Sequence, residues 1–152
     1  MATIVRTDLV AGSKGSVVTV RNGEDVLENG AFLALGALEN ADLGRSTRKV
    51  EKLKEGCVLA FLDDVALQYD ERYDERDYQL KANKTARARR ALIGEQVTIA
   101  KAHFEGSLAV GDELQVKADS YKLEKQSTGK AVAVILEDTI FEGQESYMIE
   151  FL

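Results

Sequence analysis

The sequence has no proline and no tryptophan, and it contains a single cysteine, Cys57, and a single histidine, His103. One cysteine excludes a disulfide within the chain. Cys57 lies in the apolar run 57–62, which favours a small buried hydrophobic side chain over a reactive thiol. Without proline, the turns depend on the 12 glycines together with asparagine and aspartate.

Long apolar segments are also missing. No stretch approaches the roughly 18 apolar residues of a membrane-spanning helix, and residues 1–6 lack the apolar centre of a signal peptide. We therefore expect no membrane partner and synthesis in the cytosol. The length of 152 residues, with 45% hydrophobic and 30% charged residues, is typical of one globular domain. The net charge of -6 argues against nucleic acid as the main partner, because phosphate binding needs a basic surface.

The sequence contains no recognisable catalytic set. His103 has no second histidine or nearby cysteine with which to form a zinc site. A nucleophilic pair of Cys57 and His103 is formally possible but has no local support. The 26 acidic residues are too many to single out a general acid and base, and most acids in a soluble chain are solvated. We predict a protein that is not an enzyme and that needs no metal or cofactor.

Short apolar or alternating runs separated by glycine-containing turns predict the fold. Two Asn-Gly turn signals, 22–23 and 29–30, lie near the start of the chain. The run 31–38 predicts a buried strand, with a short helix as the alternative. Further strands are expected at 17–20, 57–62, 91–100, 113–118, 130–136 and 146–152. This pattern indicates a mainly β chain, an antiparallel small barrel or sandwich.

Three segments depart from that pattern. Residues 1–22 read as a flexible N-terminal arm that ends in the first strand, before a single β-rich domain over 23–152. We expect residues 1–16 to pack poorly on their own domain and to become ordered on a neighbouring subunit. Residues 39–55 are expected to form a surface connection, and residues 70–84 one short helical excursion.

Charge is segregated between the apolar runs 57–62 and 91–100. Residues 63–77 contain seven acids and two arginines, including the repeated tetrapeptide Tyr-Asp-Glu-Arg at 69–76. Residues 81–90 contain five bases and no acid. The polar segment between the two runs, residues 63–90, is here called the charged excursion. It is expected to face outward from the core that its flanks build.

Three interpretations of this charged excursion are open. Its halves can neutralise each other in solvent, where each exposed ion pair contributes only ~0.2–1 kcal/mol. They can instead meet opposite charges on neighbouring copies of the chain, which would fix register and partner choice. Nucleic-acid binding ranks third, because no aromatic stacking surface accompanies the arginines. The candidate protein-contact residues are Asp70, Glu71, Arg72, Asp74, Glu75, Arg76, Arg87, Arg89 and Arg90.

The order of three short motifs resembles a known family. Residues 28–36 (ENGAFLALG), then 69–72 (YDER), then 86–89 (ARAR) leading into 92–99 (LIGEQVTI), are similar to small head proteins of tailed bacteriophages that infect Gram-positive hosts. Members of that family are encoded beside the major capsid protein and resemble capsid decoration, or cement, proteins. The resemblance covers residues 28–152.

The resemblance implies a non-enzymatic, β-rich viral structural protein on the outer surface of the phage head. It would be assembled in the host cytoplasm, bind the major capsid protein and stabilise contacts between its subunits. A homo-oligomer is expected, and the resemblance suggests a trimer. The alternative from another class of function is a cytosolic β-barrel binding module for an unknown ligand or for nucleic acid.

Overall fold

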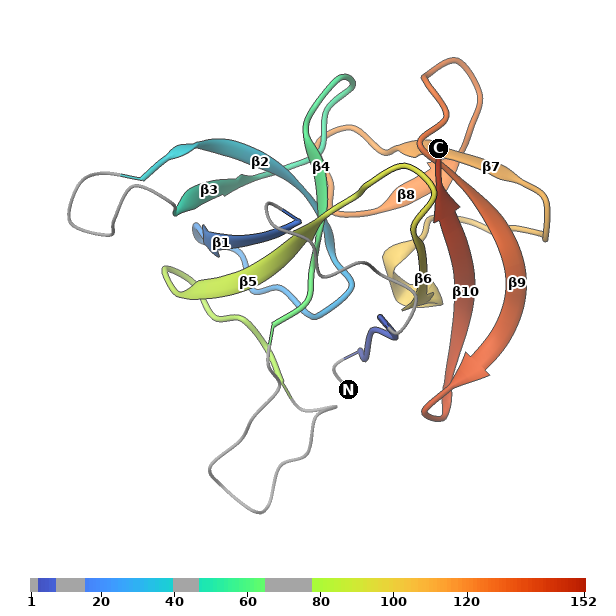
Figure 1. Cartoon of the computed structure of the whole chain (residues 1–152), viewed down its shortest axis with the longest axis horizontal. Coiled ribbons are helices and arrows are strands. Elements are labelled where there is room, and N and C mark those ends of the chain that lie inside the picture. Colours follow the sequence, from blue (N-terminus) through green and yellow to red (C-terminus); the bar gives the residue numbers. More distant parts are fainter. Residues whose placement is uncertain (1–2, 8–15, 40–46, 65–77) are drawn as a thin grey trace.

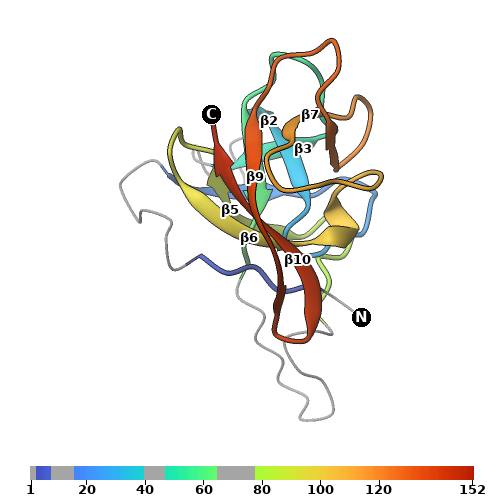
Figure 2. The same ribbon diagram turned by 90° about the vertical axis from the view of Figure 1, so that its right-hand side faces the viewer.

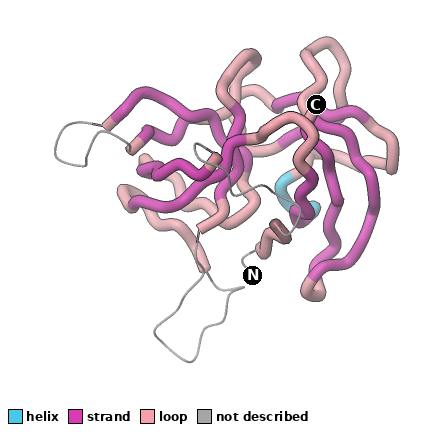
Figure 3. Tube along the Cα trace, in the orientation of Figure 1, coloured by secondary structure: helices cyan, strands magenta, loops and turns pink. Residues whose placement is uncertain are grey.

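The computed structural model of the chain describes residues 3–7, 16–39, 47–64 and 78–152. Within these ranges the chain forms a closed barrel, in the left half of Figure 1, and a second sheet, in the right half. The one helical element there is the 3-10 turn η3 (Lys101–His103), which is coloured cyan in Figure 3. The predicted mainly β fold with a small barrel is confirmed.

The barrel closes in the order β1-β3-β2-β4-β5. Its neighbouring strands are antiparallel except β1 and β3, which are parallel. Closure depends on β1 and β5, which pair along their whole length. The barrel strands are β1 (Val17–Arg21), β2 (Phe32–Leu38), β3 (Arg48–Glu51), β4 (Leu59–Leu62) and β5 (Thr85–Arg90).

The second sheet is antiparallel throughout, in the order β6-β10-β9-β7-β8. Figure 2 views the molecule from this side, with the β9–β10 hairpin in front. Glu142 and Gly143 at its tip both have positive φ, as a two-residue hairpin turn requires, so the turn predicted there is confirmed. The strands are β6 (Gln96–Ala100), β7 (Glu113–Val116), β8 (Leu123–Lys125), β9 (Ala133–Phe141) and β10 (Gln144–Phe151).

Both outer strands of the second sheet carry a short piece of additional chain. Arg6 forms an antiparallel bridge with Thr98 of β6, through N···O distances of 3.1 and 3.2 Å. Phe104 forms a parallel bridge with Leu123 of β8, where the amide of Glu105 donates to the Leu123 carbonyl at 2.8 Å. Segments distant in sequence therefore continue the hydrogen bonding of the sheet on both sides.

Strands β2 and β4 contribute to two hydrophobic cores at once. Leu33 and Ala60 point into the barrel, whereas Phe32 and Phe61 pack between the barrel and the second sheet. Alternate residues of a strand face opposite sides, and here both sides are buried. This explains why the run 31–38 begins as continuously apolar sequence, and it confirms the strand over the short helix.

The segment 39–55 is not only a surface connection, as the sequence predicted. Its residues Arg48–Glu51 form β3 inside the closed barrel, and Leu53 is 1% exposed in the core between barrel and sheet. Val50 packs partly against the barrel core while its charged neighbours face solvent. The prediction was wrong because a four-residue strand with one apolar side chain gives almost no alternation signal.

The basic half of the charged excursion is also a barrel strand. In β5 the side chains of Ala86 and Ala88 are buried in the barrel, and the arginines lie between and after them. Of the predicted helix over 70–84, residues 78–84 contain no helix but a bridge at Leu80 and a turn, and residues 70–77 lie outside the described residues. Strand β5 was not predicted because the many charges of the segment hid the alternation of alanine with arginine.

The N-terminal residues 3–7 pack on their own domain. The hydroxyl of Thr3, which is 5% exposed, donates to the Asn29 carbonyl. The amide of Ile4 donates to Gln144 Oε1 at 3.2 Å, and Val5 packs against the core between barrel and sheet. The predicted poor packing of the arm is therefore wrong for residues 3–7, while residues 8–15 lie outside the described ones.

The sharing of β4 by two cores predicts coupled unfolding. Phe61→Ala should lower the free energy of unfolding by about 3–5 kcal/mol, since a fully buried ring is replaced by a cavity. Amide hydrogen exchange should accelerate in both β5 and β10. Val110→Ala, at a side chain 58% exposed, is the control and should leave both strands protected. Acceleration in only one of the two sheets would contradict the coupling.

Candidate functional site

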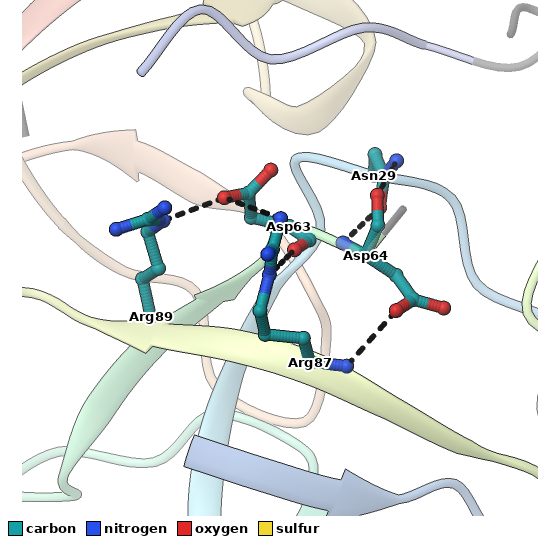
Figure 4. Close-up of polar contacts among 5 residues, drawn as sticks. All are labelled: Asn29, Asp63, Asp64, Arg87 and Arg89. Atoms are coloured by element: carbon teal, nitrogen blue, oxygen red, sulfur yellow. Dashed lines mark hydrogen bonds and ion pairs between the residues drawn. The ribbon is translucent and has the colours of Figure 1, made fainter. Parts of the chain in front are cut away.

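The acids that follow β4 meet the arginines of β5 in an ion-pair cluster on the outside of the barrel (Figure 4). Asp63 directly follows β4, and its side chain lies on the same face as those of Arg87 and Arg89 in the neighbouring strand. Arg89 Nε donates to Asp63 Oδ2 at 2.6 Å, and Arg87 Nη2 lies 3.6 Å from the same oxygen. Arg87 Nε donates to the Asp63 carbonyl at 2.8 Å.

The next residue, Asp64, joins three parts of the chain. Its amide donates to Asn29 Oδ1 at 2.9 Å, and Asn29 Nδ2 donates to the Asp64 carbonyl at 3.0 Å. Its carboxylate accepts from the Arg87 amide at 3.2 Å and from the Tyr78 hydroxyl. We call the group of Asn29, Asp63, Asp64, Tyr78, Arg87 and Arg89 the polar clasp.

Burial and a neighbouring carboxylate together keep the Tyr78 phenol of the clasp protonated. Desolvation, followed by the hydrogen bond and the charge of Asp64, raises the pKa of Tyr78, so its phenol stays protonated and donates. Asp63 and Arg89 have side chains only 12% and 15% exposed, where water screens a charge-assisted hydrogen bond weakly. The clasp contains acids, bases and amides that satisfy one another, and its geometry suits holding the chain in place.

Three of the predicted contact residues, the arginines of β5, lie within the described structure. Arg87 and Arg89 are both bound to Asp63, whose single carboxylate balances the charge of only one of the two guanidinium groups. Arg90 ends β5 and is half-buried, with no acid paired to it in the described residues. The other predicted contact residues, Asp70, Glu71, Arg72, Asp74, Glu75 and Arg76, lie outside the described residues.

Several clasp residues were not singled out from the sequence. Asp63 and Asp64 were counted only as part of the acidic run, although two acids immediately after an apolar strand can face the next strand. Nothing in the sequence singled out Tyr78, and Asn29 was assigned only to a turn. That turn is present, with Gly30 at a φ of 95°, and the Asn29 side chain additionally holds Asp64.

The histidine is buried beside the N-terminal segment, in the short turn that directly follows strand β6. His103 lies in η3, and its Nε2 is 2.7 Å from Thr3 Oγ1. Since the Thr3 hydroxyl gives its one proton to the Asn29 carbonyl, Nε2 carries a proton and donates to Thr3. Burial lowers the pKa of His103 to about 4, and the nearby positive charge of Lys122 adds to this. The imidazole is therefore neutral at pH 7.

The cysteine is half-buried, less than predicted, and packs against the core between barrel and sheet. Among the described residues, no group of three or more His, Cys, Asp or Glu side chains is arranged to hold a metal ion. None of the helical structure in those residues has the length and hydropathy needed to cross a membrane.

Comparison of the chain with protein-family models, with curated proteins and with solved structures gives no match. The clasp and the surrounding fold are therefore interpreted from their own residues.

The geometry of the clasp predicts a large effect of one arginine. Arg89→Met should lower the free energy of unfolding by about 2–4 kcal/mol, because it leaves the nearly buried Asp63 carboxylate with a single, more distant partner. Arg90→Met is the matched control and should change it by less than about 0.5 kcal/mol. Urea denaturation followed by circular dichroism measures both, and equal effects of the two substitutions would contradict the ion-pair assignment.

A second prediction concerns acid. The unfolded chain binds a proton at His103 near pH 6.5, the folded chain only near pH 4. The contribution of His103 to stability is therefore complete above about pH 6.5, falls as the pH decreases and levels off below about pH 4, a total of about 3 kcal/mol. The unfolding free energy of His103→Gln should lack this component. Parallel pH profiles of parent and variant between pH 7 and 4 would refute it.

Proposed function

We propose that the chain is a capsid decoration protein, a non-enzymatic structural component on the outer surface of a tailed-phage head, where it stabilises contacts between major capsid subunits. The support begins with the three sequence motifs that resemble such proteins. Two of these motifs, 28–36 and 86–89, meet in space at the polar clasp, where Asn29 and Arg87 both bind Asp64.

This meeting is the observation on which the proposal depends most. The third motif, 69–72, belongs to the segment that follows Asp64 and precedes Tyr78 in the chain. Asp64 and Tyr78 are hydrogen-bonded to each other, so the two ends of that segment are held together on the barrel. A segment whose two ends are held on a rigid barrel is suited to contact another protein, because less freedom is lost on binding.

The acids of that segment are the proposed contact residues. Many copies that each make a modest contact would hold a shell by avidity, so individual affinity need not be high. Pairing of Asp70, Glu71, Asp74 and Glu75 with basic groups on a capsid subunit or on a neighbouring copy would give such contacts. A trimer remains the oligomer that the resemblance suggests. Arg87 and Arg89 are engaged with Asp63 within the chain, whereas Arg90 has no acid paired to it in the described residues, so Arg90 is the most open of the three to such a contact.

The test uses empty heads assembled from the major capsid protein encoded beside this chain. The purified chain should co-sediment with the heads at saturating stoichiometry and should not retard double-stranded DNA in a gel at the same concentration. Binding of DNA without binding of heads would favour the alternative, a cytosolic binding module.

A charge-reversal variant locates the contact. Changing Asp70, Glu71, Asp74 and Glu75 together to Lys should abolish co-sedimentation at low salt. The matched control changes the exposed acids Glu24, Glu137, Glu142 and Glu145 to Lys, which alters the net charge equally, and it should retain binding. Binding by the parent should weaken near 1 M salt, where the screening length is about 3 Å. Retention of both variants on the heads would exclude these acids as the contact.

A further inference from the structure

A groove runs along the junction of the barrel and the second sheet. It consists of two adjoining clefts of about 320 and 310 Å³ that share Cys57, Leu59, Lys130 and Val132. The first continues along β7 and the residues that follow β8. The second continues past Val58 and Leu92 to Leu152. We call the two clefts together the junction groove.

The junction groove is where the core between barrel and sheet reaches the surface. The partly buried apolar side chains packed against that core are Val5, Cys57, Leu59, Ala91, Val116 and Val132. All of them except Val5 line the groove. Its floor is therefore apolar and continuous with the packed interior, and each cleft has a volume at the lower end of the range of ligand pockets, about 300–1,000 Å³.

The rim of the second cleft adds exposed apolar surface. Val58 and Leu152 are each 46% exposed and both line it. Ile93, next to the lining residue Leu92, is 85% exposed. Isolated exposed apolar residues are ordinary, but several gathered around an apolar groove mark an interaction site.

Two positive charges stand at this rim. Arg90 and Lys130 line the second cleft, and in the described part of the chain neither is paired with an acid. Other cations of the molecule are paired, such as Arg89 with Asp63 and Lys125 with Asp112. The acids of the groove lie in the first cleft, where Glu124 accepts a hydrogen bond from Gln115. The second cleft thus combines apolar side chains with two cations that have no paired acid in the described residues.

We propose that the junction groove binds an extended segment of another protein, one that places apolar side chains on the floor and a carboxylate between Arg90 and Lys130. Two adjoining clefts that share four lining residues suit an extended chain rather than a compact ligand. The apolar floor selects against nucleic acid, and the two cations select an acidic segment over a basic one. This inference does not depend on the capsid assignment.

The test pans a phage-displayed library of random nonapeptides against the immobilised full-length chain. Enriched peptides should combine several apolar residues with at least one Asp or Glu. Each is then synthesised with a fluorescein label and titrated by anisotropy. Cys57, the sole cysteine, lines both clefts, so its alkylation by iodoacetamide should slow when the peptide is bound.

Matched variants place the peptide in the groove. Val58→Glu, and separately Arg90→Glu with Lys130→Glu, should each weaken binding about tenfold or more. Val110→Glu, at another exposed valine, and Lys81→Glu with Lys84→Glu, an equal change of charge, should leave binding unchanged. Circular dichroism confirms folding. If Val58→Glu unfolds, the rim reversal decides, because Lys130 is exposed and Arg90 has no acid paired to it among the described residues.

Several results would overturn the proposal. They are an absence of enriched peptides, enrichment of basic peptides, equal binding by parent and groove variants, and an unchanged alkylation rate of Cys57 in the complex. Light scattering of the free chain can give a further result that would overturn the proposal. A dimer that Val58→Glu dissociates would mean that the groove is an interface between copies of this chain.

Discussion

The structure depends on the burial of both faces of β2 and β4. Phe32 and Phe61 fill the space between the barrel and the second sheet, while Leu33 and Ala60 fill the barrel from the same two strands. Burial of apolar surface stabilises a fold by about 25 cal/mol per Å², and these two strands bury apolar side chains in both cores. Neither core is complete without them. The second sheet therefore packs on a surface to which the barrel strands β2 and β4 contribute Phe32 and Phe61.

The polar clasp follows from that constraint. Strand β4 ends at Leu62, and the chain must leave the barrel where two acids face the arginines of β5. A carboxylate as poorly solvated as that of Asp63 is costly unless it is paired, and Arg89 supplies the short contact. Asp64 then binds Asn29 and Tyr78, so the exit and return of the chain are fixed beside the turn that begins β2. The packing of β4 and the hydrogen bonds of the clasp therefore both fix the positions of Asp63 and Asp64.

Much of the fold was predictable because apolar runs and glycine turns are local signals. The strands over 32–38, 113–116 and 144–151 were found in this way. The strand β3 was missed because it has one apolar residue, and β5 because its alternation of alanine and arginine resembles a solvated charge run. The clasp was half predicted: its arginines stood out by charge, but the choice of Asp63 as their partner depends on the pairing of β4 with β5, which is a property of the three-dimensional arrangement.

The two short segments that lie along β6 and β8 limit how copies of the chain can pair through their backbones. An open strand offers unpaired amides and carbonyls to any similar strand, and crowded copies then polymerise sheet to sheet. Here Arg6 occupies part of β6, and Phe104 with Glu105 occupies part of β8, while the barrel closes on itself. Both outer strands of the second sheet are thereby partly covered by other segments of the same chain, which leaves fewer free amides and carbonyls for pairing between molecules.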